Sequence, residues 1–510
     1  MFDLVKIASY IPTVAEPIQK LTFREKAKWT LIVLILFFVL GSITIWGVNP
    51  DAVARFEFLE IVFGSRFGSI ITLGIGPIVT ASIILQLLVG SKIINWDLSN
   101  EKDKKKFSGT QKILTLVFCF ITAIAYVVAN AVPPATPDLG LTAFIVLQLA
   151  LGGIIIMFMD EVVSKWGFGS GVSLFIAAGV AKTILVRTLN PLTQAGTFPM
   201  EGEFPAGIIP FFIASFLEGT PALLNLLPLL GTILVFIIVV FIQDIKVEIP
   251  MAFSLPFGKF SARRWPLKFL YTSNIPVILV AAVLANLQVL GRVLYERGIT
   301  FLGTYSEQGT PNPGGFMYYV STPSGEVGIM IVTIIGSMLA LGFVILALRV
   351  WKKNAFKMCV LGAIIGMILG YLLISYYNLP GITIGGILHI MVYISVYVLG
   401  SVIFSIFWTS TSGMDSKSVA EQFKTYLIMI PGFRHDPRIV ERVLDRYIPA
   451  LTVMGGAFIG FLAAYADLTS AIGTGTGLLL ATMIVYQFYE QITSQHKEDM
   501  PPQIKKFLGD

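Results

Sequence analysis

Long apolar runs, separated by short polar segments, account for most of this 510-residue chain. A run of about 20 apolar residues is long enough to cross the roughly 30 Å hydrocarbon layer of a bilayer as an α-helix. The pattern therefore predicts an all-α, polytopic membrane protein. We expect twelve membrane-spanning helices, over residues 29–48, 67–89, 113–132, 142–159, 167–186, 222–242, 269–290, 327–348, 358–376, 382–408, 448–466 and 472–489.

The second apolar run is interrupted at its middle by Gly74-Ile75-Gly76-Pro77. Proline removes a backbone donor and clashes with the preceding helical turn, and the flanking glycines add backbone freedom. We therefore expect this span to bend or break in the middle of the membrane. Non-helical backbone survives at that depth only beside protein or a water-filled cavity, because lipid offers no hydrogen-bond partners. The interruption predicts that the chain encloses a path.

Composition agrees with this pattern, since 55% of the residues are hydrophobic and 13% are charged, against roughly 25% charged in soluble proteins. The mean hydropathy is +0.81. Lysine and arginine indicate the orientation, because short cytoplasmic loops retain them. With the N-terminus inside, the inner segments hold 30 of the 36 basic residues. The charge distribution predicts that residues 1–28 and 493–510 both lie in the cytoplasm.

Familiar catalytic signatures are absent from the sequence: it has no Walker loop, nucleophile elbow, HExxH pair or dinucleotide fingerprint. Cys119 and Cys359 lie within predicted spans and the three histidines are scattered, so we expect no disulfide, no metal and no cofactor. The middles of the spans carry almost no ionisable residues, whereas ion-coupled transporters usually need one there. The sequence predicts a passive path rather than an enzyme or a pump.

Three segments expected on the outer side, 49–66, 187–221 and 291–326, are rich in glycine, proline and aromatic residues. We expect them to fold over the outer mouth. The first is either an interfacial helix on the outer leaflet or a segment folded back into a cavity. Its apolar stretch is too short to span the membrane and contains Phe56, Phe58, Leu59, Ile61, Val62 and Phe63.

Two segments expected on the inner side, 245–268 and 415–446, combine basic residues with proline and glycine. Their charge either sets only the orientation of the chain or forms a docking surface for an anionic partner. Ribosomal RNA phosphates and an acidic protein face are the two kinds of partner that fit. The candidates for contact are Lys259, Arg263, Arg264 and Arg434.

Residues 73–88, with the sequence LGIGPIVTASIILQLL, closely resemble the SecY family, the channel subunits of the archaeal protein-conducting translocon. Further matches follow in collinear order over nearly the whole chain, at residues 166–179, 273–279, 432–434 and 447–454. The resemblance implies ten family helices in two halves of five, arranged as an inverted repeat around a central hourglass pore.

On this resemblance, residues 29–190 form the N-terminal half with spans one to five. Residues 191–326 hold outer segments and spans six and seven, and residues 382–492 hold the last three family spans. Residues 327–376 look like an added pair of spans, which we expect at the periphery. An even number of added spans leaves the orientation of every later span unchanged.

The resemblance also implies functional residues. The apolar stretch at about 56–65 matches the family's plug, which would seal the outer funnel. A lateral gate toward lipid would carry Thr80, Gln86, Thr122 and Asn274, each of which is also an ordinary helix-packing residue. An apolar pore ring would comprise Ile75, Val79, Phe168, Val172, Ile278 and Leu462, with Phe168 departing from the aliphatic residue expected there.

The sequence thus predicts a cell-membrane channel that passes unfolded secretory chains outward and releases apolar segments, such as signal peptides, into lipid. The ribosome or another partner would drive it, and small membrane subunits of the SecE and Sec-beta types would accompany it. A secondary transporter for a small solute is one rival, because it would also explain a broken second span. A membrane enzyme acting on lipids is another, and it would require a polar catalytic cluster that the sequence lacks.

Overall fold

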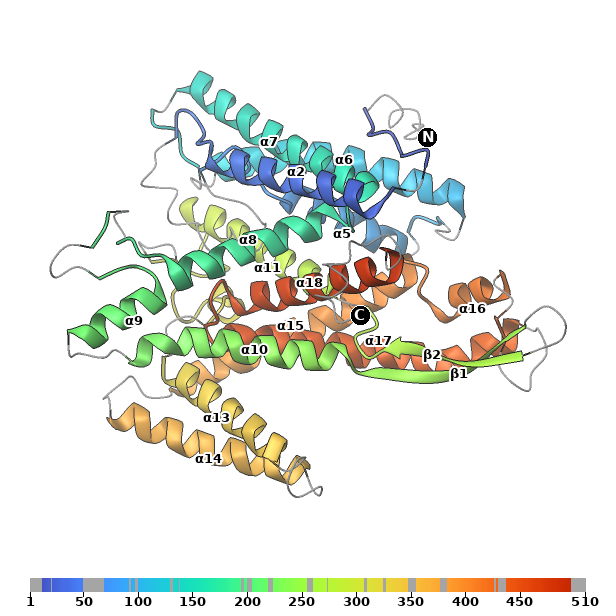
Figure 1. The fold of residues 1–510 in the computed structure, drawn as a ribbon. Coiled ribbons are helices and arrows are strands. Elements are labelled where there is room, and N and C mark those ends of the chain that lie inside the picture. Colours follow the sequence, from blue (N-terminus) through green and yellow to red (C-terminus); the bar gives the residue numbers. More distant parts are fainter. Residues whose placement is uncertain are drawn as a thin grey trace.

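The chain forms a bundle of long helices that are aligned along one direction (Figure 1). The computed structural model describes residues 12–19, 21–48, 68–90, 93–96, 100–128, 132–136, 138–193, 197–199, 204–218, 223–254, 260–272, 274–306, 310–323, 327–346, 355–376, 383–425, 428–429 and 437–496.

Ten of the described helices fall into two sets of five. The first set is α2 (Phe23–Ser42), α5 (Gly76–Gly90), α6 (Glu101–Val128), α7 (Leu139–Trp166) and α8 (Gly171–Leu189). The second set is α10 (Leu227–Gln243), α11 (Ile275–Glu296), α15 (Ile384–Thr411), α17 (Pro437–Leu468) and α18 (Gly475–His496). The sets meet where α8 packs on α18 and where α5 packs on α11 and α15.

Each predicted span overlaps one long described helix once α13 (Val327–Leu346) and α14 (Ala355–Tyr376) are added, which confirms the predicted membrane bundle. By length and composition, eight helices among the described residues are able to cross a membrane. Side chains at their ends satisfy backbone groups that a helix leaves unbonded. For example, Thr22 and Glu25 form a reciprocal capping box at the start of α2, and the Thr383 hydroxyl accepts from Gly386 N at the start of α15.

The predicted break in the second span is present, because helix α5 begins only at Gly76 and residues 68–75 form successive turns. Pro77 therefore stands in the first turn of a helix, where its missing N–H has no helical partner to lose. Gly74 has a φ of +52°, in the left-handed region. The turns bond one another and the residues that follow α2, with Ile45 N donating to Gly68 O and Ile70 N to Ile43 O.

Helix α7 closes over this non-helical segment. A Cβ added at Gly152 would lie 1.8 Å from Ile70 O, so no side chain fits between the two backbones at that point. Ile71, Leu73 and Ile75 are almost fully buried. The irregular backbone is thus covered by protein, which is the condition that a bilayer imposes on it.

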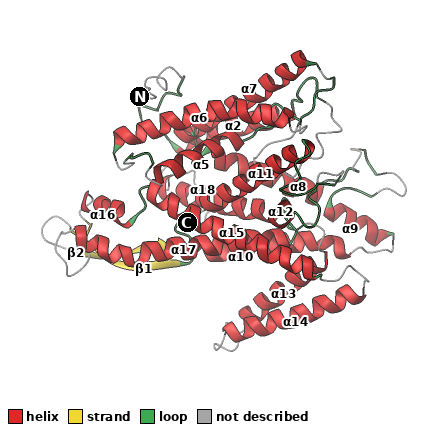
Figure 2. Ribbon diagram, turned by 180° about the vertical axis from the view of Figure 1, so that it is seen from behind, coloured by secondary structure: helices red, strands yellow, loops and turns green. Residues whose placement is uncertain are grey.

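One end of the bundle carries a small antiparallel sheet, and we call it the sheet end (Figures 1 and 2). The strand order is β2 (Phe260–Lys268), β1 (Lys246–Ser254) and β3 (Ile428–Met429). The sheet packs with α16 (Ser416–Thr425) and the start of α17 around a separate apolar core of Ile249, Leu267, Val419, Ala420, Phe423, Val440, Leu444, Ile448 and Leu451. The two basic segments predicted from the sequence therefore join in one structured unit.

The opposite end of the bundle carries short helical pieces. These are α9 (Ile208–Leu217), the 3₁₀ turn η2 (Leu223–Leu226) and α12 (Phe316–Val320). Ten residues at 1.5 Å each make α9 about 15 Å long, too short to span a bilayer. Its exposed Ile213, Phe216 and Leu217 leave an apolar face on this end of the molecule.

Helices α13 and α14, the added pair, form a hairpin at the edge of the bundle (Figure 1). Ile331 and Ile334 of α13 and Ile374 of α14 pack with Leu227 at the start of α10. The two helices approach closely, because a Cβ added at Gly366 would lie 2.4 Å from Gly336 Cα. Small residues that let backbones meet are the usual basis of helix pairing in lipid.

We predict that Gly366→Leu separates the hairpin, because the new side chain collides with backbone that has no room to yield. We expect a loss of about 1–3 kcal/mol, typical of overpacking, seen as a lower thermal midpoint of the purified chain in detergent. Gly342→Leu on α13 is the matched control, since a Cβ there meets no atom within 4 Å. Equal midpoints for the two variants would contradict the packing described.

Candidate functional site

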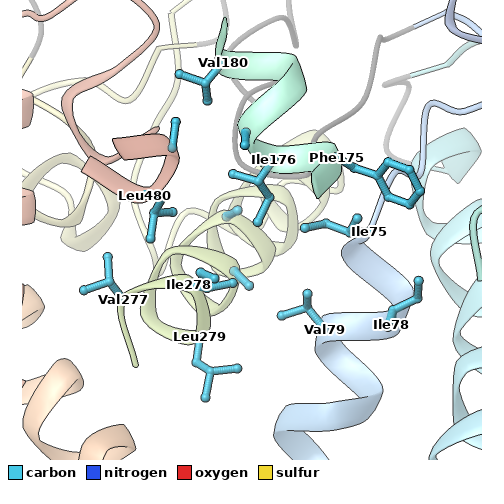
Figure 3. Close-up of a cluster of buried hydrophobic side chains, with 14 of the residues drawn as sticks. Ile75, Ile78, Val79, Phe175, Ile176, Val180, Val277, Ile278, Leu279 and Leu480 are labelled. Carbon is cyan, nitrogen blue, oxygen red and sulfur yellow. The ribbon is translucent and has the colours of Figure 1, made fainter. Parts of the chain in front are cut away.

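Apolar side chains from distant parts of the chain meet between the two sets of helices (Figure 3). Ile75, directly before α5, and Val79, in its first turn, point toward Ile176 of α8 and Ile278 of α11. We call these four residues the collar. All four are buried, with exposed fractions of 1% for Ile75 and Ile176, 6% for Val79 and 9% for Ile278. Leu480 of α18 lies beside them in the same view.

The collar consists only of aliphatic side chains, which offer no hydrogen bond to water or to an ion. A narrow apolar constriction excludes water and so blocks ions. Burial of apolar surface holds the collar together. Because this interaction has no preferred direction, the collar favours no particular geometry in a molecule that contacts it. The arrangement seals a path without binding tightly what passes through it.

Five of the six residues predicted for the pore ring belong to one hydrophobic cluster. Ile75, Val79, Ile278 and Leu462 are buried members of it, and the half-buried Val172 packs against it.

Phe168, the sixth predicted residue, is not named among the described members of that cluster. It precedes α8, its ring centroid is 5.3 Å from that of Phe23, and its backbone N donates to Thr30 Oγ1 at 3.1 Å. Ile176 points to the collar instead. The sequence offered a signal for this, because Ile176 follows Val172 by four residues and so shares its helix face.

The start of α8, which positions Val172 and Ile176, is fixed by Asp160 of α7. Val172 N donates to Asp160 Oδ1 at 2.9 Å, and Ser170 Oγ lies 3.5 Å from the same oxygen. A carboxylate there bonds amide groups that the first turn of a helix leaves unpaired and interacts favourably with the helix dipole. Asp160 was not among the residues predicted from the sequence.

One polar contact joins the two sets of helices beside the collar: Asn286 Nδ2 of α11 donates to Thr80 Oγ1 of α5 at 3.2 Å. Thr80 was predicted for the lateral gate, but Asn286 was missed. An amide within the apolar span 269–290 was the available signal. Neutral polar pairs of this kind hold helices together in lipid with modest strength.

The other three predicted gate residues make different contacts. Gln86 Nε2 donates to Ser82 Oγ on its own helix at 2.9 Å, and Thr122 bonds the carbonyl of Phe118 on α6. Asn274 precedes α11 and accepts from Gln487 Nε2 of α18 at 3.4 Å. None of these three contacts crosses between α5 or α6 and α11.

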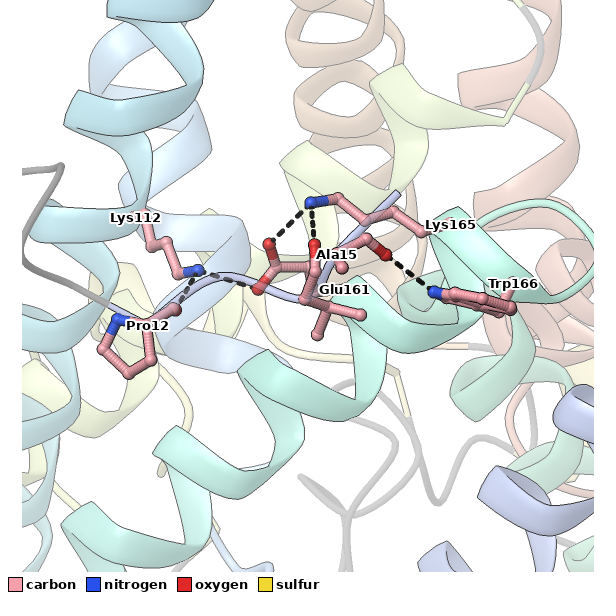
Figure 4. A network of polar contacts seen from close by, with 7 residues as sticks. Pro12, Ala15, Lys112, Glu161, Lys165 and Trp166 are labelled. Carbon is pink, nitrogen blue, oxygen red and sulfur yellow. Dashed lines mark hydrogen bonds and ion pairs between the residues drawn. The ribbon is translucent and has the colours of Figure 1, made fainter. Parts of the chain in front are cut away.

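A charged network at the sheet end ties the N-terminal segment to α6 and α7 (Figure 4). Glu161 of α7 lies between Lys112 and Lys165, with N–O distances of 2.7 and 3.1 Å. The two ammonium groups and the Trp166 indole also donate to backbone carbonyls within residues 12–15 at 2.5–2.8 Å. These bonds hold the segment against the first half of α6 and the last turns of α7.

Some of the predicted site residues lie outside the described part of the chain, and others lie in β2. The plug candidates Phe56, Phe58, Leu59, Ile61, Val62 and Phe63, together with Lys259 and Arg434, lie outside the described residues. Arg263 and Arg264 are in β2, where they pair with Met251 and Pro250 of β1. Within the described part of the chain, no group of three or more His, Cys, Asp or Glu residues is placed to hold a metal ion.

Comparison with known proteins settles the family. The SecY family matches residues 69–489. This chain belongs to the SecY family. The protein translocase subunit SecY of Methanocaldococcus jannaschii is 39% identical over 510 residues, covering 100% of both chains. That of Pyrococcus furiosus is 37% identical, covering 98% of this chain and 97% of the relative.

Solved structures of SecY-type channels agree with the fold described above. A structure of a protein-conducting channel has a TM-score of 0.76 and 39% identity, covering 99% of this chain and 100% of that one. Sec61 in a canine ribosome–channel complex from the endoplasmic reticulum has a TM-score of 0.74 and 39% identity. That comparison also covers 99% of this chain and 100% of the other. The resemblance predicted from residues 73–88 is confirmed over the full chain.

A double-mutant cycle will measure the contact between α5 and α11. We predict that Thr80→Val and Asn286→Leu each destabilise the chain but are less than additive together, with a coupling of about 0.6–2 kcal/mol. The measurement is thermal or denaturant unfolding in detergent. As a control, Thr80→Val combined with Gln288→Leu on α11 should be additive. Full additivity for the first pair would show that the Thr80–Asn286 bond is not formed.

Proposed function

We propose that this member of the SecY family conducts unfolded polypeptides across the membrane through the collar and releases apolar segments into lipid between α5 and α11. The collar carries this proposal, because four buried aliphatic residues from three helices converge between the two halves. A solute transporter or a lipid-modifying enzyme would need a polar binding or catalytic cluster at such a place. We expect the chain to hydrolyse nothing itself.

The pore ring in this proposal comprises Ile75, Val79, Val172, Ile176, Ile278 and Leu462. At rest these side chains pack together and exclude water, so ions do not cross. A passenger chain displaces them from one another and replaces their mutual contacts with contacts of its own. Because apolar contacts are non-directional, passengers of many sequences pass equally well.

The lateral exit lies where α5 and α6 face α11 and α15. The contact that supports this assignment is the Thr80–Asn286 bond. Bonds between neutral polar side chains in lipid contribute only about 0.6–2 kcal/mol. A hydrophobic signal sequence that enters between the helices offsets this loss by moving its own apolar surface into lipid.

The sheet end faces the cytoplasm in our proposal. The reason is the distribution of charge, because 30 of 36 basic residues then lie inside. Both termini, 1–28 and 493–510, would be cytoplasmic, and the membrane would be the cell membrane. The apolar stretch at 56–65 would then act as a plug on the outer side of the collar.

Partners approach the sheet end. We propose that Lys259, Arg263, Arg264 and Arg434 contact ribosomal RNA, since lysine and arginine neutralise phosphate groups. A related Sec61 channel is described in a complex with a ribosome. Small subunits of the SecE and Sec-beta types would bind in the membrane, and the SecE type would hold the two halves together. The hairpin of α13 and α14 stands at the edge, away from the collar.

Opening the collar to water tests its sealing role. We predict that serine or glycine at Ile75, Val79 or Ile278 raises resting ion conductance severalfold in planar bilayers, because the constriction becomes wider or wettable. Ile368→Ser on α14 is the control, since Ile368 is 56% exposed and far from the collar in sequence and fold. Unchanged leakage in all three collar variants would show that the seal lies elsewhere.

Charge reversal tests the docking role of the inner basic segments. We predict that Arg434→Glu weakens ribosome binding and makes the remaining affinity less dependent on salt, because fewer counterions are released. Arg297→Glu, beyond the opposite end of α11, serves as the control. Binding is measured by cosedimentation at several salt concentrations. Equal salt dependence in the wild-type and Arg434→Glu chains would assign Arg434 to orientation alone.

A further inference from the structure

A short internal repeat marks the starts of two helices that border the collar. Residues 169–176 read GSGVSLFI, and residues 473–480 read GTGTGLLL. The first copy spans the start of α8 and the second the start of α18, which are the fifth helices of the two sets. Gly169 lies beside Phe488, near the end of α18, so the two helices run in opposite directions. The copies thus occupy equivalent places in an inverted repeat.

The backbone turns in the same way in both copies. The first glycine has a φ in the left-handed region, +64° in one copy and +83° in the other. The second glycine stands where the preceding helix leaves no room for a side chain. A Cβ added at Gly171 would lie 2.5 Å from Asp160 Cα on α7. One added at Gly475 would lie 1.7 Å from the carbonyl carbon of Ala466 on α17. Both helices therefore start against the backbone of the helix before them.

A carboxylate on that preceding helix bonds the start of each helix. On α7, Asp160 Oδ1 accepts from Val172 N at 2.9 Å. On α17, Asp467 Oδ1 accepts from Thr476 N, also at 2.9 Å. Each amide belongs to the fourth residue of its copy, and a hydroxyl of the same copy lies within 3.5 Å of the same oxygen. Two aspartates far apart in the chain thus make one kind of contact.

The starts of both helices need such an acceptor. The first amides of a helix have no partner within it, and Ser170, at the N-cap of α8, forms no side-chain cap. The turn before α18 is strained, since Ser470 and Thr474 have φ values of +47° and +60°. The Thr474 hydroxyl accepts from Gly477 N at 3.2 Å, so this turn is bonded by its own threonine and by Asp467. Such strain persists only where surrounding contacts fix the backbone.

Both carboxylates are themselves held in place. Asp467 Oδ2 accepts from the Tyr393 hydroxyl of α15 at 2.7 Å, and the two side chains are 4% and 1% exposed. Asp160 is half-buried and adjoins Glu161 of the charged network described above. Because a buried polar group is costly when it loses its partner, the contacts of Asp467 restrict where the start of α18 can lie.

The spacing from carboxylate to collar is the same in both halves. The collar residue Ile176 follows Val172 by four residues. Leu480, which lies beside the collar, follows Thr476 by four. Four residues make about one helical turn, or about 6 Å along the axis. A helix whose first turn is fixed therefore presents the side chain of its next turn at a fixed height and rotation.

We propose that Asp160 and Asp467 are a symmetry-related pair of positioning residues, each of which fixes one side of the closed collar. This inference rests on the proposed function and adds two residues to it. Each carboxylate acts through the helix that it bonds, and that helix places the aliphatic side chain one turn further on. The resting seal therefore depends on two polar contacts that lie outside the seal itself.

Thiol labelling tests the position of each helix without a passenger. In a chain whose two native cysteines are serine, cysteine replaces Ile176 or Leu480, and a water-soluble maleimide reports its exposure in proteoliposomes. We expect Asp160→Ala to raise the labelling rate at position 176 and Asp467→Ala to raise that at position 480, each by roughly two- to thirtyfold. That range corresponds to about 0.5–2 kcal/mol, the usual cost of losing a helix N-cap.

Conservative variants separate positioning from a general loss of structure. Asp160→Asn and Asp467→Asn keep an oxygen acceptor, so we expect them to restore most of the protection. Asp138→Ala is the matched control, because Asp138 bonds Gly140 N at the start of α7, which carries no collar residue.

Where an alanine variant does not fold, Asp→Glu carries the test, since it keeps the carboxylate but moves it by one methylene and should also raise labelling. Parental labelling rates in the folded alanine or glutamate variants would overturn the pair. Equal rates in the alanine and asparagine variants would overturn it too.

Ion conductance relates the pair to the seal. We expect Asp160→Ala and Asp467→Ala to raise resting conductance in planar bilayers severalfold, while unfolded passengers still cross. Raised labelling with unchanged conductance would overturn the role of the pair in the seal. A wild-type chain that carries no passenger would overturn the proposed function instead, and the labelling result would stand without it.

Discussion

A bilayer offers no hydrogen-bond partner to an open backbone, and this constraint governs the centre of the molecule. Residues 68–75 are not helical although they lie within an apolar run. Their turns bond one another and residues 43 and 45, and α7 meets them backbone to backbone at Gly152. Because this segment is enclosed, Ile75 and Val79 are directed to the interface between the halves rather than to lipid.

The energetics of that interface suit a channel that must both seal and open. Its collar is aliphatic, so its cohesion is non-directional and falls as soon as the halves separate. The polar contact described beside it, Thr80 to Asn286, is of the weak kind that neutral pairs make in lipid. The ion pairs of Glu161 with Lys112 and Lys165 lie away from the collar and within the first set of helices. The contacts described at the collar are therefore apolar or neutral.

The two ends of the bundle differ in structure. The sheet end has a core of its own beneath a hairpin of β1 and β2, whereas the opposite end has short helices with exposed apolar faces. A structured projection with basic residues is able to present a fixed surface to a large anionic partner.

The sequence was least informative where contacts rather than local patterns decide. Phe168 was placed in the ring, but the helix of Val172 begins after it, and Ile176 is the residue one turn further along the same face. Asn274 was placed at the lateral gate, yet it bonds Gln487 of α18, and Asn286 bonds Thr80 instead. The basic segment 245–268 carried no local signal for strands, yet it forms two strands, which pack on a core that includes residues 419–451.

The sequence by itself determined the spans, the break at Gly74–Pro77 and the family. Each of these depends on residues close together in the chain: apolar length against bilayer thickness, the effect of proline on its own helix, and a continuous motif. Only the tertiary structure decided which apolar side chains form the collar and which amides meet across helices. One aliphatic residue in a span resembles another, and its neighbours come from helices up to several hundred residues away, so no local pattern distinguishes a collar residue from one that faces lipid.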